Sequence, residues 1–127
     1  MNNQEISRAL FNAFMSGDDN SARALCNDTL KARQNGGAPM TLDMLLVFAK
    51  AVRDITKDFR YENVVCSDTG KGFVEEHDVC ATLSDGSLFL MPVCVVAEVE
   101  HGKITRLSEY FDTAAAKNLA KALSAAG

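Results

Sequence analysis

Four residues that can transfer protons or bind metal ions follow one another inside a predicted β-strand. Glu75, Glu76, His77 and Asp78 lie in the segment FVEEHDVCATL, residues 73–83. Charged side chains are depleted at strand centres unless they face water or line a site. Because side chains alternate between the two faces of a strand, the four residues divide into two pairs. The available chemistry therefore depends on which pair faces the interior.

The turn after this strand decides which pair that is. The sequence Ser-Asp-Gly-Ser at residues 84–87 joins the strand to a second one, residues 88–100. If Asp85 and Gly86 are the central residues of a type I′ turn, Asp78 pairs with Val93. This register sends His77 and Glu75 to the outer face, and it predicts an inward face made of Glu76, Asp78, Cys80, Thr82, Phe89, Met91, Val93 and Val95.

The next turn, around His101 and Gly102, allows two registers. A two-residue turn places Ser108 beside Val95, whereas a three-residue turn with Gly102 in the left-handed conformation places Glu109 beside Val93. We favour the second, which uses glycine where a positive φ is needed and brings Leu107, Glu109 and Phe111 to the face of Glu76 and Asp78. Three carboxylates in apolar surroundings would raise one another's pKa and would need a cation or a shared proton.

The elements that hold these residues follow from hydrophobic periodicity, caps and turn residues. The pattern predicts helices at residues 4–15, 21–26, 41–56 and 113–126, and strands at 29–34, 59–67, 73–83, 88–100 and 103–111. Helices followed by a meander indicate one α+β domain, residues 1–127. Strands this long must curl, so we expect a cone: a curved, mostly antiparallel sheet on three N-terminal helices, closed by a C-terminal helix around a pocket.

Composition narrows the function classes. The formal net charge is -4 and the basic residues are scattered, which argues against nucleic acid as a partner. No apolar run is long enough to cross a bilayer, and we expect a cytoplasmic protein. The four cysteines lack C-x-x-C spacing and are expected to be reduced thiols. The sequence gives no motif for a cofactor, and carboxylates without an inward histidine would suit only hard cations, so no metal is expected.

Three segments resemble the SnoaL-like branch of the nuclear transport factor 2-like superfamily: FVEEHDV, the LSDG turn, and HGKITRLSEYFD at residues 101–112. The resemblance implies a cone-shaped fold, a pocket inside the cone, and a homodimer joined through the outer sheet face. The family includes ketosteroid isomerases, polyketide cyclases and limonene-1,2-epoxide hydrolase.

The epoxide hydrolase is the most similar of these along the EEHDV and GKIT…EYFD segments, and its site resembles an Asp-Arg-Asp set. Carried over, one Asp falls on Asp78, the Arg on Glu76 and the second Asp on Glu109. Glu in place of Arg reverses the local charge, which argues against the same mechanism. Lys31 and Arg33 on the first strand match pocket positions of the hydrolase, and Arg33 would restore neutrality beside Glu76 and Glu109.

The sequence therefore predicts Asp78, Glu109 and Glu76 as catalytic carboxylates. The predicted ligand-binding residues are Arg33, Lys31, Tyr61, Cys80, Met91, Val93, Leu107 and Phe111. The expected function is that of an isomerase, cyclase or hydrolase acting on a small, mostly apolar molecule. The alternative is a non-catalytic module that binds a small molecule or assembles as a dimer. Acids fully engaged in ion pairs, without a cavity of roughly 300 Å³, would favour that alternative.

Overall fold

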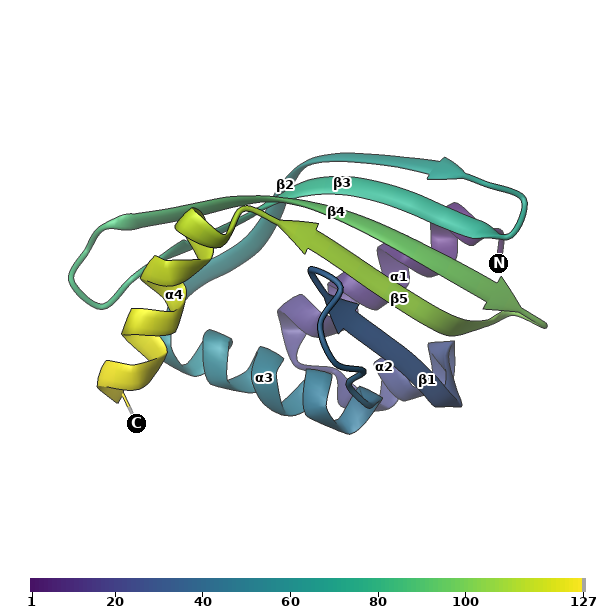
Figure 1. Ribbon diagram of the computed structural model, residues 1–127, viewed down its shortest axis with the longest axis horizontal. Helices are drawn as coiled ribbons and strands as arrows, with labels where there is room; N and C mark the ends of the chain where they lie inside the picture. The colour runs from purple at the N-terminus through teal and green to yellow at the C-terminus, as the bar shows by residue number, and fades with distance from the viewer. Residues whose placement is uncertain (127) are drawn as a thin grey trace.

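A curved five-stranded sheet arches over three helices, and a fourth helix closes one end (Figure 1). The computed structural model describes residues 1–126. Its elements are α1 (Asn3–Ser16), α2 (Asp19–Leu25), β1 (Cys26–Gln34), α3 (Leu42–Ile55), β2 (Lys57–Asp68), β3 (Gly72–Thr82), β4 (Leu88–Glu100), β5 (Lys103–Phe111) and α4 (Thr113–Ala126). The strand order is β1-β5-β4-β3-β2, with β1 parallel to β5 and the other pairs antiparallel. The predicted α+β class and every predicted element are confirmed.

Short polar motifs set the helix ends where the sequence places them. At α1, Asn2 accepts a hydrogen bond from the Glu5 amide at 2.8 Å, and the Glu5 carboxylate accepts one from the Asn2 amide at 2.9 Å. This capping box satisfies two amides that the first turn leaves free. Gly17 ends the helix with φ +77°, and Thr41 caps α3 by accepting from the Met44 amide. Local hydrogen bonds thus define where these helices begin and end.

The core lies between α1–α3 and the concave face of the sheet. Leu10 of α1, Phe73 of β3, Val95 of β4, and Ile104 and Leu107 of β5 are almost completely buried. Burying such side chains stabilises a fold by roughly 1.5–3 kcal/mol each. Residues of α3 and α4, among them Leu46 and Leu119, also belong to this core. No helix within residues 1–126 is long and apolar enough to cross a membrane.

The β3–β4 loop is one residue longer than a type I′ turn. Leu83 donates a hydrogen bond to the Ser87 carbonyl and accepts one from the Gly86 amide, both at 2.9 Å, and Gly86 has φ +85°. This is the pattern of a type I turn followed by a left-handed residue. The predicted two-residue turn is therefore wrong, and Thr82 pairs with Leu88.

The longer loop exchanges the two faces of β3. His77 pairs with Val93 and Glu75 with Val95, on the concave face, because a shift of one residue turns every side chain to the opposite side. The predicted inward positions of Glu76, Asp78 and Cys80 are wrong for this reason. On β4 the expected inward residues, Phe89, Met91, Val93 and Val95, are confirmed as buried.

The β4–β5 connection turns Glu109 inward as predicted, although its turn differs from the predicted one. Glu100 pairs with Lys103, so His101 and Gly102 form a two-residue turn with φ +51° and +75°, and the favoured three-residue turn is wrong. An irregularity between Glu98 and Val99 then shifts the register. Glu109 consequently pairs with Val95 and lies on the concave face, as predicted.

Candidate active site

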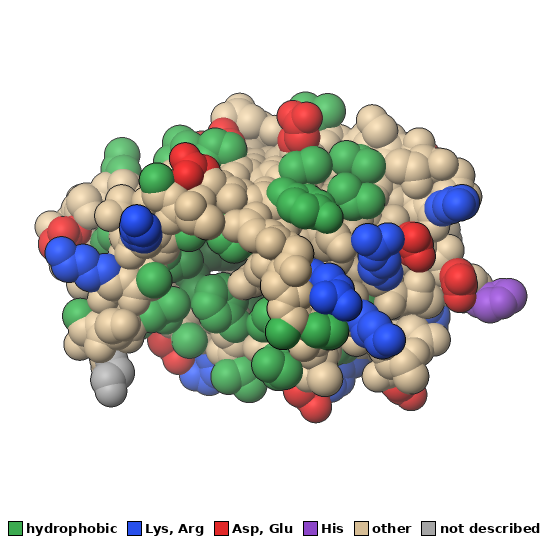
Figure 2. All heavy atoms as spheres, in the orientation of Figure 1, with side chains coloured by type: hydrophobic (Ala, Val, Ile, Leu, Met, Phe, Trp, Pro, Cys, Tyr) green, Lys and Arg blue, Asp and Glu red, His purple; other side chains and the backbone are tan. Residues whose placement is uncertain are grey.

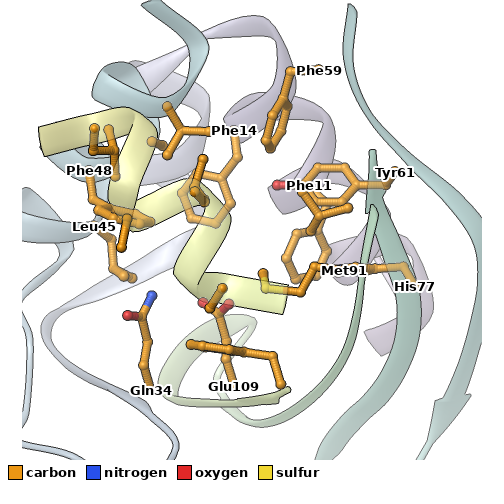
Figure 3. A pocket seen from close by; sticks show the side chains of 18 residues that line it. Phe11, Phe14, Gln34, Leu45, Phe48, Phe59, Tyr61, His77, Met91 and Glu109 are labelled. Carbon is orange, nitrogen blue, oxygen red and sulfur yellow. The ribbon is translucent and has the colours of Figure 1, made fainter. Parts of the chain in front are cut away.

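A cavity of about 300 Å³ opens on the concave side of the sheet, between the strands and helices α1, α3 and α4. Figure 2 shows a hollow rimmed by hydrophobic side chains beneath the sheet, beside α4. The walls are aromatic and aliphatic. Only Gln34, Tyr61, His77 and Glu109 bring polar side chains to them. Figure 3 shows Gln34 and Glu109 on one side of the cavity and Tyr61 and His77 on another. A mostly apolar pocket with a few polar groups is typical of a small-molecule site.

Glu109 is the carboxyl group of this cavity. It stands on β5 beside Gln34 of β1 and Val95 of β4, and no side chain within residues 1–126 forms an ion pair or a hydrogen bond with it. Burial raises the pKa of Glu109 above its ordinary value, and His77 partly opposes this rise. An acid with a raised pKa can hold a proton and also release it, as a general acid or base must.

His77 is held in place by a buried carboxylate. Its Nδ1 lies 2.6 Å from Oε2 of Glu75, and Oε1 of Glu75 accepts a hydrogen bond from the Ser7 hydroxyl of α1 at 2.8 Å. The side chains of His77 and Glu75 are 2% and 3% exposed. A carboxylate accepts and does not donate, so it keeps the proton on Nδ1 and leaves Nε2 as the nitrogen available for proton transfer.

Two aromatic rings contact the imidazole of His77. The Phe11 centroid lies 4.7 Å from it and the Tyr61 centroid 4.6 Å. Burial, with smaller contributions from Glu109 and Glu75, raises the pKa of Tyr61 far above its ordinary value. The phenol therefore remains protonated and can donate a hydrogen bond to a ligand oxygen. In Figure 3 its hydroxyl points into the cavity.

The predicted ligand-binding residues divide between the cavity, the core and the outer face. Tyr61, Met91 and Phe111 line the cavity, and Val93 and Leu107 are buried core residues on the same side of the sheet. Lys31 and Arg33 are exposed on the outer side of β1, and the Arg33 guanidinium donates to the Gly37 carbonyl at 2.9 Å. The expectation that Arg33 neutralises inward acids is wrong, because alternation along β1 turns Ala32 and Gln34 inward instead.

Three other predicted residues lie away from the cavity. Glu76 is exposed. Asp78 accepts a hydrogen bond from the Asn63 amide group at 2.8 Å on the convex face. The Cys80 thiol lies 3.6 Å from a Glu62 carboxylate oxygen on that face, and desolvation, followed by the Glu62 charge, raises the pKa of the thiol. Their positions give no support to a catalytic role for Glu76 or Asp78 or to ligand contact by Cys80.

Sequence reasoning missed His77, Glu75 and Gln34 as inward polar residues. The signal for Gln34 was present, because the apolar alternation of Leu30 and Ala32 continues to it. His77 and Glu75 lie in a segment whose strand was predicted, but the face to which they turn depends on the length of the β3–β4 loop. Within residues 1–126, no group of three or more His, Cys, Asp or Glu side chains is arranged to hold a metal ion.

Comparison with solved structures identifies the fold class. The chain shares its fold with solved structures described as a candidate polyketide cyclase, a protein with a ketosteroid isomerase-like fold and an NTF2-like protein. It resembles IdmH from Streptomyces antibioticus, a candidate polyketide cyclase, with TM-score 0.82 and 17% identity over 95% of this chain and 99% of that one.

Two further structures share the fold. A protein from Catenulispora acidiphila with a ketosteroid isomerase-like fold, in complex with trimethylamine, has TM-score 0.73 and 15% identity over 87% of this chain and 88% of that one. A LEH-like epoxide hydrolase from M. tuberculosis has TM-score 0.70 and 20% identity over 95% and 91%. The sequence matches no protein-family model and no curated protein. Identities this low establish the fold alone.

Proposed function

We propose that this protein is an enzyme that transfers protons on a small, mostly apolar molecule held in the cavity, as an isomerase, cyclase or hydrolase. The observation that carries the proposal is the combination of an unpaired carboxyl, Glu109, with a histidine, His77, that Glu75 orients. Two titratable groups in different environments at one cavity are the usual arrangement for an acid and a base.

The roles of the residues follow from their surroundings. Glu109 has a raised pKa and serves as the proton-transferring carboxyl. His77 exchanges a proton through Nε2, and Glu75 is a positioning residue that stabilises the imidazolium when it forms. The Tyr61 hydroxyl donates to the substrate oxygen and stabilises negative charge that develops on it. Removal of a proton beside a carbonyl, or protonation of an epoxide oxygen, fits this set.

The sequence-based proposal changes in its residues and not in its reaction class. It now rests on Glu109 with His77, in place of Glu109 with Asp78 and Glu76. Support comes from the cavity of about 300 Å³ and from the absence of an ion pair at Glu109 within residues 1–126. Acids fully engaged in ion pairs and the lack of a cavity would instead have favoured a non-catalytic module. That module remains the alternative.

Turnover of three probe reactions tests the proposal: isomerisation of 3-cyclohexenone, exchange of α-protons of cyclohexenone in deuterium oxide, and hydrolysis of limonene-1,2-epoxide. For a probe that is turned over, Glu109→Gln should lower kcat/KM by about 100-fold or more, because it removes the proton-transferring group and keeps the shape. The matched control is Asp78→Asn, which alters an acid on the convex face and should change kcat/KM by less than about twofold. A larger loss in Asp78→Asn than in Glu109→Gln would overturn the assignment, and binding of a probe with no turnover would favour the non-catalytic alternative.

We further propose a homodimer joined through the convex face of the sheet. This face carries exposed apolar residues of β2, β4 and β5: Val65, Leu88, Leu90 and Tyr110. Lys31, Arg33 and Arg106 line a shallow recess of about 180 Å³ at the β1 side, whereas Glu76 and Asp78 lie toward β2. In a two-fold dimer the basic side of one copy can face the acidic side of the other, which supports self-association.

The cytoplasm remains the proposed location, because the four cysteines are free thiols.

A further inference from the structure

The cavity gathers most of the aromatic residues of the chain. The sequence holds seven phenylalanines and two tyrosines. Six of these residues line the cavity: Phe11, Phe14, Phe48, Phe59, Tyr61 and Phe111. They come from α1, α3, β2 and β5, so the rings surround the space from several directions (Figure 3).

The rings are inclined to one another and do not stack. The interplanar angle is 66° between Phe11 and Phe14, 69° between Phe11 and Tyr61, and 85° between Phe59 and Tyr61, with centroids 5.3–6.0 Å apart. Rings at steep angles to one another border the shared space from different sides. Aromatic walls of this kind attract cations, because the face of each ring carries partial negative charge.

The charged side chain on the cavity wall also favours a cation. Glu109 is the acid on its wall, and no lysine or arginine is among the lining residues. The nearby cation Arg53 is directed elsewhere, with its guanidinium donating to the Phe14 carbonyl at 2.6 Å. Glu75 already accepts from Ser7 and contacts His77. Of these two acids, Glu109 alone lacks a side-chain partner among the described residues. It is partly buried, and removing an unpaired carboxylate from water is costly.

We propose that the cavity binds an organic ammonium ion: a small apolar body that carries a protonated tertiary amine or a quaternary ammonium group. The ammonium group lies beside Glu109, and the aromatic rings enclose its alkyl groups. This inference concerns binding and goes beyond the proposed catalysis, since it holds whether or not turnover follows. It also fits the proposed chemistry, because a bound cation keeps Glu109 ionised, which is the form a general base requires.

The proposal predicts a direction for the pH dependence of binding. The titratable groups that face Glu109 across the cavity are His77 of β3 and Tyr61 of β2, while β1, α1, α3 and α4 line it with residues that do not titrate. The cation binds the ionised form of Glu109, whose pKa burial raises. Affinity should therefore increase as the pH rises through that pKa, and cation binding should release a proton.

The test uses a charged ligand and its neutral isostere. Benzyltrimethylammonium and neopentylbenzene have the same shape. The first has a positively charged nitrogen where the second has a neutral carbon atom. Their dissociation constants for the full chain are measured by isothermal titration calorimetry or ligand-observed NMR. We expect the cation to bind at least about tenfold more tightly than the isostere in spite of its greater cost of dehydration. In Glu109→Gln the preference should fall to about twofold or less.

A matched control separates the cavity charge from the net charge of the protein. Glu76→Gln makes the same change on the convex face and should keep the tenfold preference. Phe59→Leu should weaken binding of the cation more than that of the isostere, because it removes a ring and retains an apolar wall. Equal affinity for the two ligands, or a cation preference that survives in Glu109→Gln, overturns the proposal. Because no turnover is measured, this result leaves the catalytic proposal to its own test.

Discussion

Glu75 and Glu76 are neighbours in sequence with opposite surroundings. Glu75 is 2% exposed and engages both Ser7 and His77, whereas Glu76 is exposed to solvent. Loss of one partner from a buried, hydrogen-bonded pair leaves the other unsatisfied. The side chain of Glu75 therefore contributes to stability as well as to the orientation of His77.

A pair of alanine substitutions measures this difference. Glu75→Ala should lower the free energy of unfolding by about 3–5 kcal/mol, because it leaves the buried imidazole of His77 without its carboxylate partner and opens a void. Glu76→Ala, measured at a protein concentration at which the chain is monomeric, should change it by no more than about 0.5 kcal/mol. Urea denaturation followed by circular dichroism measures both values. A larger loss of stability in Glu76→Ala than in Glu75→Ala would instead support the register predicted from the sequence, in which Glu76 faces inward.

The raised pKa of Glu109 makes stability depend on pH. The folded chain retains the Glu109 proton over a range in which the unfolded chain, with a pKa near the ordinary 4.5, has lost it. Between these two pKa values the folded state binds more protons, so stability falls as the pH rises. Below both values the contribution of this group is constant.

Glu109→Gln removes this dependence. We expect the free energy of unfolding of the variant, relative to the wild type, to increase as the pH rises from about 4 to about 8. Denaturant titrations at several pH values measure the difference, and His101→Gln serves as a control because His101 is an exposed turn residue. A difference that stays constant with pH would show that Glu109 is not held protonated by burial.

Loop length, at the scale of elements, decided which residues form the site. Caps, periodicity and turn residues together predicted the helices and strands, because those signals are local. The β3–β4 register was not predictable in this way. Both a type I′ turn on Asp85 and Gly86 and a three-residue loop of Ser84, Asp85 and Gly86 place the glycine at positive φ. Only packing of β3 against the helices distinguishes them, by burying Val79 and His77 in one register and Cys80 and Asp78 in the other.

Glu109 was predicted to face inward although its turn was not. Two differences from the predicted β4–β5 pairing, a shorter turn and an irregularity next to it, moved the register by two residues in total, which preserves the face. Met91, Val93 and Phe111 were likewise placed by strand alternation. The prediction failed for Glu76, Asp78 and Cys80 because they follow from the β3–β4 turn, where a one-residue change in loop length has no second shift to compensate it.

A close contact of Gly72 in β3 with the backbone of β4 gives a prediction about these strands. A Cβ on Gly72 would lie 2.0 Å from the Ala97 carbonyl oxygen, whereas one on Gly86 would meet no atom within 4 Å. Gly72→Ala should therefore separate the strands and destabilise the fold by about 3 kcal/mol or more. Gly86→Ala should cost only about 1 kcal/mol, from its positive φ. Thermal denaturation compares the two, and equal losses would contradict the strand pairing.

The sheet of the whole molecule is apolar on both faces, and the described chain covers only one of them. The concave face holds the core and the cavity. The convex face leaves Val65, Leu90 and Tyr110 about half exposed or more, at 61%, 55% and 48%. Figure 2 shows hydrophobic side chains gathered over the strands, with charged ones around them. Exposed apolar side chains grouped on one surface, with charged side chains among and around them, are typical of a protein interface.

Self-association through this face predicts a specific response to substitution. Light scattering should give the wild type a mass of twice the 13.7 kDa chain. Leu90→Glu places a charge in the apolar centre and should produce a monomer, since burying an unpaired charge costs several kcal/mol. Val47→Glu makes a comparable change on α3, where Val47 is 70% exposed and distant from the sheet, and should leave the dimer intact.

Arg106→Glu should weaken the dimer most at low salt, because it places like charges opposite each other. A monomeric wild type, or a dimer that Val47→Glu disrupts and Leu90→Glu does not, would place the interface elsewhere.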